Sequence, residues 1–373
     1  MSIETSRRIA ANDYGRGIGI FLVVLGHVLI GLDDHAILAE SSFPHSLAFS
    51  RGAVAWIYAF HMPLFFFLSG SLAERLVRKP FRDVLSSRLR GIAWPYVLWS
   101  LLQESLRELT GISQGTAADW WRILYRPMMQ FWFLYVLFFL SLAYYGLRRL
   151  GVPRIGVLIL AAVLHAGHLY TDVPVMGWVY HEFCKHGLYL AAGAVAAEWL
   201  ERGTIRVADS MVARLLAAVC GYGLIAACVT RGWPVEPTVL AFVGIGASIV
   251  LASVLATHRT AAFIERWGLL SLQIYVAHTI VSAAVRTALL RYGVHDPLTH
   301  LLTQTAAGLY GPIALYEVCQ SLGCDWVFTL RRPAAPMSRA SGERAQAESG
   351  GVPSSAQDRG DPSEQNAETA SGA

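Results

Sequence analysis

Long apolar runs separated by short, arginine-rich polar segments dominate this chain. A helix needs about 20 predominantly apolar residues to cross the hydrocarbon core of a bilayer, and the runs fit that length repeatedly. The pattern predicts an all-α polytopic membrane protein with about ten transmembrane helices. The predicted spans cover residues 17–34, 53–73, 91–106, 131–147, 155–171, 184–200, 211–230, 238–256, 268–290 and 298–322.

The end of the chain has a different composition. After Arg332 it consists mainly of Ala, Ser, Gly, Pro, Glu and Arg, with almost no aliphatic residues to bury in a core. We therefore predict a membrane-embedded domain over residues 1–330 and a disordered cytoplasmic tail over residues 331–373.

Composition and charge support a membrane location. The chain is 54% hydrophobic and 15% charged, against roughly 25% charged residues in soluble domains. With the N-terminus inside, roughly twice as many Lys and Arg residues fall on the cytoplasmic side as on the other, which predicts that both termini are cytoplasmic. The short polar N-terminus has no clear cleavage site, so the first span is expected to remain as an anchor. No basic patch indicates nucleic-acid binding, and the five cysteines have no metal-ligand spacing, so we expect free thiols and no metal site.

Three histidines lie deep inside predicted spans. His27, His61 and His278 are each about 12 to 15 Å from a span end, at the 1.5 Å rise of a helix. An ionisable side chain at that depth is a candidate functional group, and imidazole suits proton transfer near neutral pH. We predict that the three share a polar interior and act in catalysis. The alternative is that each only hydrogen-bonds a neighbouring helix, and this structural interpretation is favoured for His165, His168 and His186.

An arginine-rich loop is predicted between the second and third spans. Residues 75–90 carry six basic side chains and lead directly into Gly91-Ile92-Ala93-Trp94-Pro95-Tyr96. The loop is either a topology signal alone or a binding site for a polyanion. Guanidinium groups bind phosphates as planar forks, so Arg88 and Arg90 are candidates to bind the phosphates of an acyl donor such as acetyl-CoA.

Several segments together resemble the acyltransferase 3 family of integral membrane acyltransferases. Any one of these motifs is weak, but the resemblance extends in the family's order over most of residues 10–325. Within the family, the wording Phe-His-Met-Pro at residues 60–63 is closest to the sugar O-acetylase branch that modifies fucose or exopolysaccharide units. The matching segments are Asn12 to Gly19 followed by Leu25-Gly26-His27, Phe60 to Gly70, Arg88 to Tyr96, Phe131 to Leu134 and Ser271 to His278.

The resemblance implies an enzyme of the bacterial inner membrane with no bound cofactor. It would move an acyl group, usually acetyl from cytoplasmic acetyl-CoA, to a sugar hydroxyl of an exopolysaccharide, a lipid-linked oligosaccharide or a similar glycan.

Site residues follow from the same resemblance. It makes His27 the essential histidine of the first helix and Arg88 the first of two donor-side arginines. The family usually places the second arginine three residues later, where this chain has Gly91, so Arg90 is the nearest candidate. The acidic and basic positions before the first span are Asp13 and Arg16. The motifs also contain Ser69, Trp132 and Tyr275, which contact substrate or serve in packing.

Two other classes of protein remain open at this point. In a polysaccharide or small-molecule transporter, the midplane histidines would be proton-relay or substrate contacts, although no inverted repeat or matching pair of broken helices is visible. In a membrane sensor they would bind a small ligand. An acyltransferase is distinguished from both by consuming the acyl donor.

Overall fold

The computed structural model describes residues 3–38, 45–111, 117–168, 177–201, 210–258 and 261–330. All regular secondary structure in these ranges is helical. The predicted tail over 331–373, and with it the predicted domain boundary, lies outside the described residues. The α-helices are α1 (Ile3–Asp34), α2 (Ser46–Tyr58), α3 (His61–Ser71), α4 (Glu74–Val77), α5 (Phe81–Arg88), α6 (Trp94–Leu109), α7 (Trp132–Arg149), α8 (Arg154–Gly167), α9 (Gly177–Glu201), α10 (Met211–Arg231), α11 (Pro237–His258), α12 (Ala262–Leu269), α13 (Ser271–Arg291) and α14 (Pro297–Ser321). A π-helix (Leu89–Ala93) and the 3₁₀ segments Ala117–Leu124, Met129–Phe131 and Asp325–Val327 complete the set.

Each predicted span coincides with a helix or a pair of helices, which confirms the all-α polytopic membrane fold. Six segments of the described residues are both long and apolar enough to cross a bilayer. The predicted spans on α6, α8, α9 and α14 are not among these six, and the total number of crossings remains a prediction. The six segments are Ala10–Asp34, Ser46–Val77, Trp121–Arg149, Met211–Arg231, Pro237–His258 and Ser271–Arg291.

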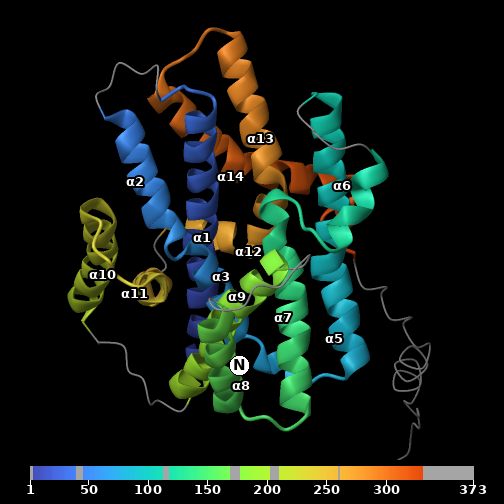
Figure 1. Ribbon diagram of the computed structural model, residues 1–373, viewed down its shortest axis with the longest axis vertical. Helices are drawn as coiled ribbons and strands as arrows, with labels where there is room; N and C mark the ends of the chain where they lie inside the picture. Colours follow the sequence, from blue (N-terminus) through green and yellow to red (C-terminus); the bar gives the residue numbers. More distant parts are fainter. Residues whose placement is uncertain are drawn as a thin grey trace, which may run out of the picture. The chain divides into compact units, whose positions relative to one another are not determined.

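Helix α1 packs against helices that are far from it in the sequence as well as against those that follow it directly. It contacts α2, α3, α11, α12, α13 and α14, and Figure 1 shows it in dark blue among them. Glycines permit the closest of these contacts. A Cβ on Gly268 of α12 would overlap the carbonyl oxygen of Asp13, and one on Gly17 of α1 would overlap the carbonyl oxygen of Ile264. Small residues let helix backbones approach in this way where no hydrophobic effect drives association.

Helices α3 and α9 also pack closely through glycines that face backbone carbonyls. A Cβ on Gly70 would overlap the carbonyl oxygen of Leu190, and a Cβ on Gly193 would overlap that of Phe67. The contact lies just past the middle of α9, and about one turn earlier in this helix the ring of His186 lies 4.6 Å from that of Phe66.

Two predicted spans are broken, which corrects the sequence analysis. The span 53–73 is divided into α2 and α3 at Ala59 and Phe60. Pro63 explains this break, because it has no N–H to donate to the Ala59 carbonyl four residues earlier. The span 268–290 is divided into α12 and α13 at Leu270, close to Gly268, a residue of low helix propensity.

The predicted arginine-rich loop is largely helical, which is a further correction. Helix α5 begins after Pro80, has Asp83 in its first turn and ends with Arg88 in its last. This arrangement of charge matches the helix dipole. The π-helix Leu89–Ala93 then joins α5 to α6. A π-helical turn inside an α-helix is uncommon and is frequent at functional sites.

Candidate functional site

A cavity of about 300 Å³ lies where several helices begin or end. The start of α3 contributes His61, the start of α7 contributes Trp132, and the N-terminal part of α9 contributes Trp178 to Tyr189. Helix α1 contributes His27 and α13 contributes Tyr275. Four of the predicted site residues, His27, His61, Trp132 and Tyr275, therefore line one space.

The predicted histidines lie close together. The rings of His27 and His278 are 5.1 Å apart at an angle of 68°. The Tyr58 ring lies 4.6 Å from that of His61 and 6.5 Å from that of His27. His278 does not line the cavity, and its Nε2 is buried without a hydrogen-bond partner. The structure thus places His278 behind His27, as seen from the cavity.

Hydrogen bonds to the backbone determine which ring nitrogen of each imidazole carries the proton. Nδ1 of His27 donates to the Val23 carbonyl at 2.8 Å, and Nδ1 of His61 donates to the Ile57 carbonyl at 2.9 Å. Nδ1 of His278 has the same relation to Tyr275 at 2.8 Å. A carbonyl oxygen only accepts, so the proton of a neutral ring must be on Nδ1. Nε2 is then left with its lone pair, which makes it a proton acceptor.

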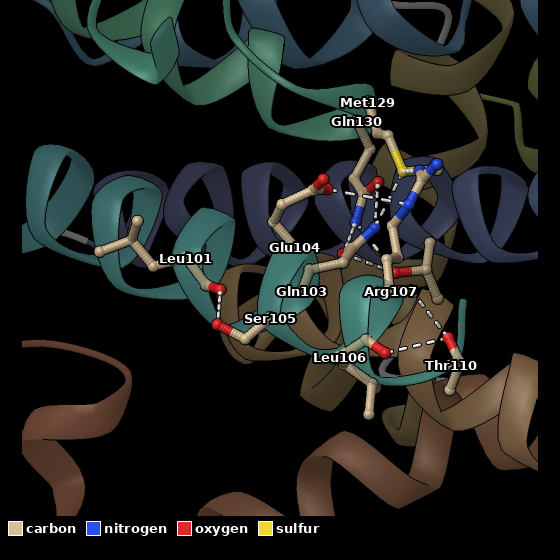
Figure 2. A network of polar contacts seen from close by, with 10 residues as sticks. Leu101, Gln103, Glu104, Ser105, Leu106, Arg107, Thr110, Met129 and Gln130 are labelled. Atoms are coloured by element: carbon tan, nitrogen blue, oxygen red, sulfur yellow. Dashed lines mark hydrogen bonds and ion pairs between the residues drawn. The ribbon is translucent and has the colours of Figure 1, made fainter. Parts of the chain in front are cut away.

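Gln130 is held in the cavity wall by a polar network. Its Nε2 donates to Gln103 Oε1 at 2.8 Å and to Thr279 Oγ1 at 2.9 Å, and its carbonyl accepts from the Tyr275 hydroxyl. Figure 2 shows the Gln103 and Gln130 side chains facing each other across this network. It joins α6 to α13 through the short segment before α7, and so fixes one wall of the cavity.

A strained backbone precedes this wall residue. Met129 has a φ of 41°, which a side chain other than glycine rarely adopts. Its sulfur accepts from Arg107 at 2.6 Å, as the dashed lines of Figure 2 mark. Strain of this kind persists where surrounding contacts hold it, and it concentrates at functional sites.

Aromatic rings form the other end of the cavity. The Trp132 ring lies 5.1 Å from His186 and 6.1 Å from Trp178, to which it is nearly perpendicular. Trp178 is 48% exposed, so this end of the cavity opens outward. Indole faces beside a few polar groups are typical of small-molecule sites.

Three of the predicted donor-side residues form a separate group: Asp13 and Arg16 in the first half of α1, and Arg88 at the end of α5. Burial lowers the pKa of Arg88 from its ordinary value, and the nearby Arg16 guanidinium lowers it further. Nε of Arg88 is buried without a hydrogen-bond partner. Asp13 lies near Arg16 and Glu265. Two guanidiniums that repel each other, with one unsatisfied donor, are suited to an anion that would bridge them.

The structure does not bring the whole predicted set into one place. Arg16, Arg88, Arg90 and Asp13 do not line the cavity. Arg16 and His27 are eleven residues apart on α1, which corresponds to about 16 Å along the helix axis. Ser69 is half-buried near the end of α3 and also lies outside the cavity lining.

Several cavity residues were missed by the sequence analysis. Glu182, Lys185, His186 and Gln130 all line the cavity, and His186 had been given a structural role. The signal available in the sequence was the spacing of Glu182 and His186, because residues four apart share one face of a helix.

Comparison with known proteins identifies the class to which this fold and cavity belong. The model of the acyltransferase domain of the acyltransferase 3 family matches residues 9–317. The chain therefore belongs to this family of membrane acyltransferases, as the sequence motifs indicated.

Individual relatives are distant. Nodulation protein NolL of Mesorhizobium japonicum is 26% identical over 190 residues, which cover 50% of this chain and 48% of NolL. Inner membrane protein YcfT of Escherichia coli K12 is 27% identical over 201 residues, which cover 48% of this chain and 54% of YcfT. The chain thus spans about half the length of these relatives. No solved structure matches it.

Proposed function

We propose that the protein transfers acetyl from acetyl-CoA to a sugar hydroxyl of a bacterial exopolysaccharide, lipid-linked oligosaccharide or similar glycan. The observation that carries the proposal is the lone pair left on Nε2 of His27 in a membrane-embedded cavity, because a hydroxyl must lose its proton to attack a thioester. The acyltransferase family supplies the class of reaction.

In the proposed reaction, Nε2 of His27 takes the proton of the sugar hydroxyl as its oxygen attacks the thioester carbonyl. The new C–O bond forms, the C–S bond breaks, and the proton passes to the leaving thiolate of coenzyme A. His278 packs against His27 and holds its ring, and His61 accepts a hydrogen bond from the acceptor. A positioned general base of this kind contributes about 10² to 10⁴ in rate.

The donor enters from the cytoplasmic side in this proposal. Arg16 and Arg88 bind the phosphates of coenzyme A, with Asp13 beside Arg16, and Arg90 is a further candidate from the sequence. The acyl arm then extends about 16 Å along α1 to reach His27. The open end of the cavity supports acceptor binding from the other face, because the predicted topology places the N-terminal ends of α7 and α9 there. The name of the relative YcfT, an inner membrane protein, supports the proposed location.

Purified protein incubated with acetyl-labelled coenzyme A and a glycan acceptor tests the proposal. The wild type should form labelled glycan, His27→Gln should lose nearly all transfer, and the exposed His295→Gln should behave as wild type. A transporter would neither hydrolyse nor transfer the label. An active His27→Gln protein would remove the centre of the mechanism.

A further inference from the structure

Glu182 and His186 form a hydrogen-bonded pair in the cavity wall that the proposed reaction does not use. Nδ1 of His186 lies 3.1 Å from Glu182 Oε2 and 3.0 Å from the Glu182 carbonyl. Both side chains are largely buried, with 3% of His186 and 19% of Glu182 exposed. The other cavity histidines, His27 and His61, bond only to backbone carbonyls.

The hydrogen bonds of the pair stay within α9, whereas polar residues that stabilise a helix bundle bond across to another helix. The His186 ring packs against Phe66 of α3 and Trp132 of α7. That packing involves only the ring and gives no reason for the largely buried carboxylate of Glu182, because burying a carboxylate is costly unless it is compensated. The place of this carboxylate in the cavity wall points to a ligand.

The neighbours of the pair indicate what that ligand is. Trp132 packs 5.1 Å from the His186 ring, and the half-exposed Trp178 lies at the opening. A sugar ring has an apolar C–H face that packs on an indole, and hydroxyls at its edge that donate hydrogen bonds. Glu182 Oε1 and His186 Nε2 make no hydrogen bond to a described residue, and both are acceptors for such hydroxyls.

We propose that Glu182 and His186 bind a hydroxyl of the acceptor sugar next to the reacting one, and so select which hydroxyl reaches His27. This inference rests on the proposed function and adds to it the choice of the sugar hydroxyl that is acylated. The pair and the base His27 line the same cavity of about 300 Å³, so one sugar ring in this cavity can contact both. The acceptor class is a sugar with neighbouring free hydroxyls.

The experiment compares wild type, Glu182→Gln and Glu108→Gln, the last an exposed glutamate of α6 as matched control. Hydrogen bonds to a charged group are strong enough that Glu182→Gln should raise the KM for the acceptor about tenfold or more, with the KM for acetyl-CoA unchanged. NMR of the product should show acetyl spread over more than one hydroxyl. An unchanged acceptor KM and a single product in Glu182→Gln would overturn the proposal.

A second measurement needs no folded variant. Acceptors that lack the hydroxyl beside the acetylated one should bind wild type about tenfold more weakly. If Glu182→Gln folds, it should bind the deoxy acceptor almost as well as it binds the complete acceptor, because the substitution and the missing hydroxyl remove the same interaction. A wild type that accepts the deoxy sugar equally well refutes the subsite. A wild type that transfers no acetyl at all refutes the proposed function instead.

Discussion

Replacing Gly268 by Ala should weaken both the fold and donor binding. The new Cβ would overlap the Asp13 carbonyl oxygen and lie 2.9 Å from the Gly17 amide nitrogen, whereas ordinary contacts are 3.4–4 Å. Both neighbours are backbone atoms of α1, which no rotamer change moves away. Helix α12 would have to retreat by about 1 Å or more, and overpacking of this kind typically costs about 1–3 kcal/mol.

Part of that cost is offset by the substitution itself, since Ala in a helix is more favourable than Gly by about 0.5–1 kcal/mol. The matched control is Gly246→Ala in α11, where a Cβ meets nothing within 4 Å. Gly268→Ala should therefore unfold at a lower temperature than wild type in detergent, while Gly246→Ala should unfold at the same or a higher temperature.

The retreat of α12 also disturbs the segment of α1 that carries Asp13 and Arg16. We therefore expect the KM for acetyl-CoA to rise in Gly268→Ala, with less effect on the acceptor, because His27 lies more than two turns further along α1. Identical melting of Gly268→Ala and Gly246→Ala would refute the reasoning, because the two differ only in what the new methyl group meets.

Other predictions address the donor site, the base and the topology. Arg88→Ala should weaken acetyl-CoA binding without altering thermal unfolding, and Arg88→Lys should restore it only in part because an ammonium lacks the planar fork; unchanged donor affinity in both would leave Arg88 as a topology signal. The wild-type rate should fall on the acid side of its pH profile, because a protonated imidazole no longer accepts the hydroxyl proton; a rate that stays level at every acid pH at which the protein remains folded would exclude a histidine base. Reporter fusions should report a cytoplasmic position after Arg90 and an extracytoplasmic one after Arg51, and the reverse result would overturn the proposed orientation.

The sequence located three of the histidines because depth in a helix follows from counting. The rise per residue is constant, so His27, His61 and His278 could be assigned a common depth without knowing how their helices pack. The same counting failed for His186. The predicted span began at residue 184 and so put His186 at its end, whereas α9 begins at Gly177. His186 therefore lies more than two turns inside the helix, with Glu182 on the same face.

Packing distances between helices could not be predicted from the sequence, for a different reason. The break between α2 and α3 was readable from Pro63, but the direction in which α3 then runs depends on contacts such as Gly70 with Leu190. The split of the predicted site into a histidine group and an arginine group likewise depends on which helices neighbour α1. Local propensity and hydrophobic period do not contain that information.

The hydrogen bonds from Nδ1 to backbone carbonyls let the histidines lie inside the membrane, and they also set which nitrogen accepts a proton in the proposed reaction. A ring N–H inside a bilayer needs an acceptor; His27 and His278 find one in a carbonyl of their own helix, and His61 at the start of α3 finds one in the Ile57 carbonyl near the end of α2. Each acceptor lies four residues earlier in the chain, so the bond fixes the proton on Nδ1 whatever occupies the cavity. The remaining lone pair on Nε2 then has no partner among the described residues, and for His27 and His61, which line the cavity, a ligand bound there would supply one. A hydroxyl donor is the simplest such ligand, and it is also the group that an acyltransferase must deprotonate.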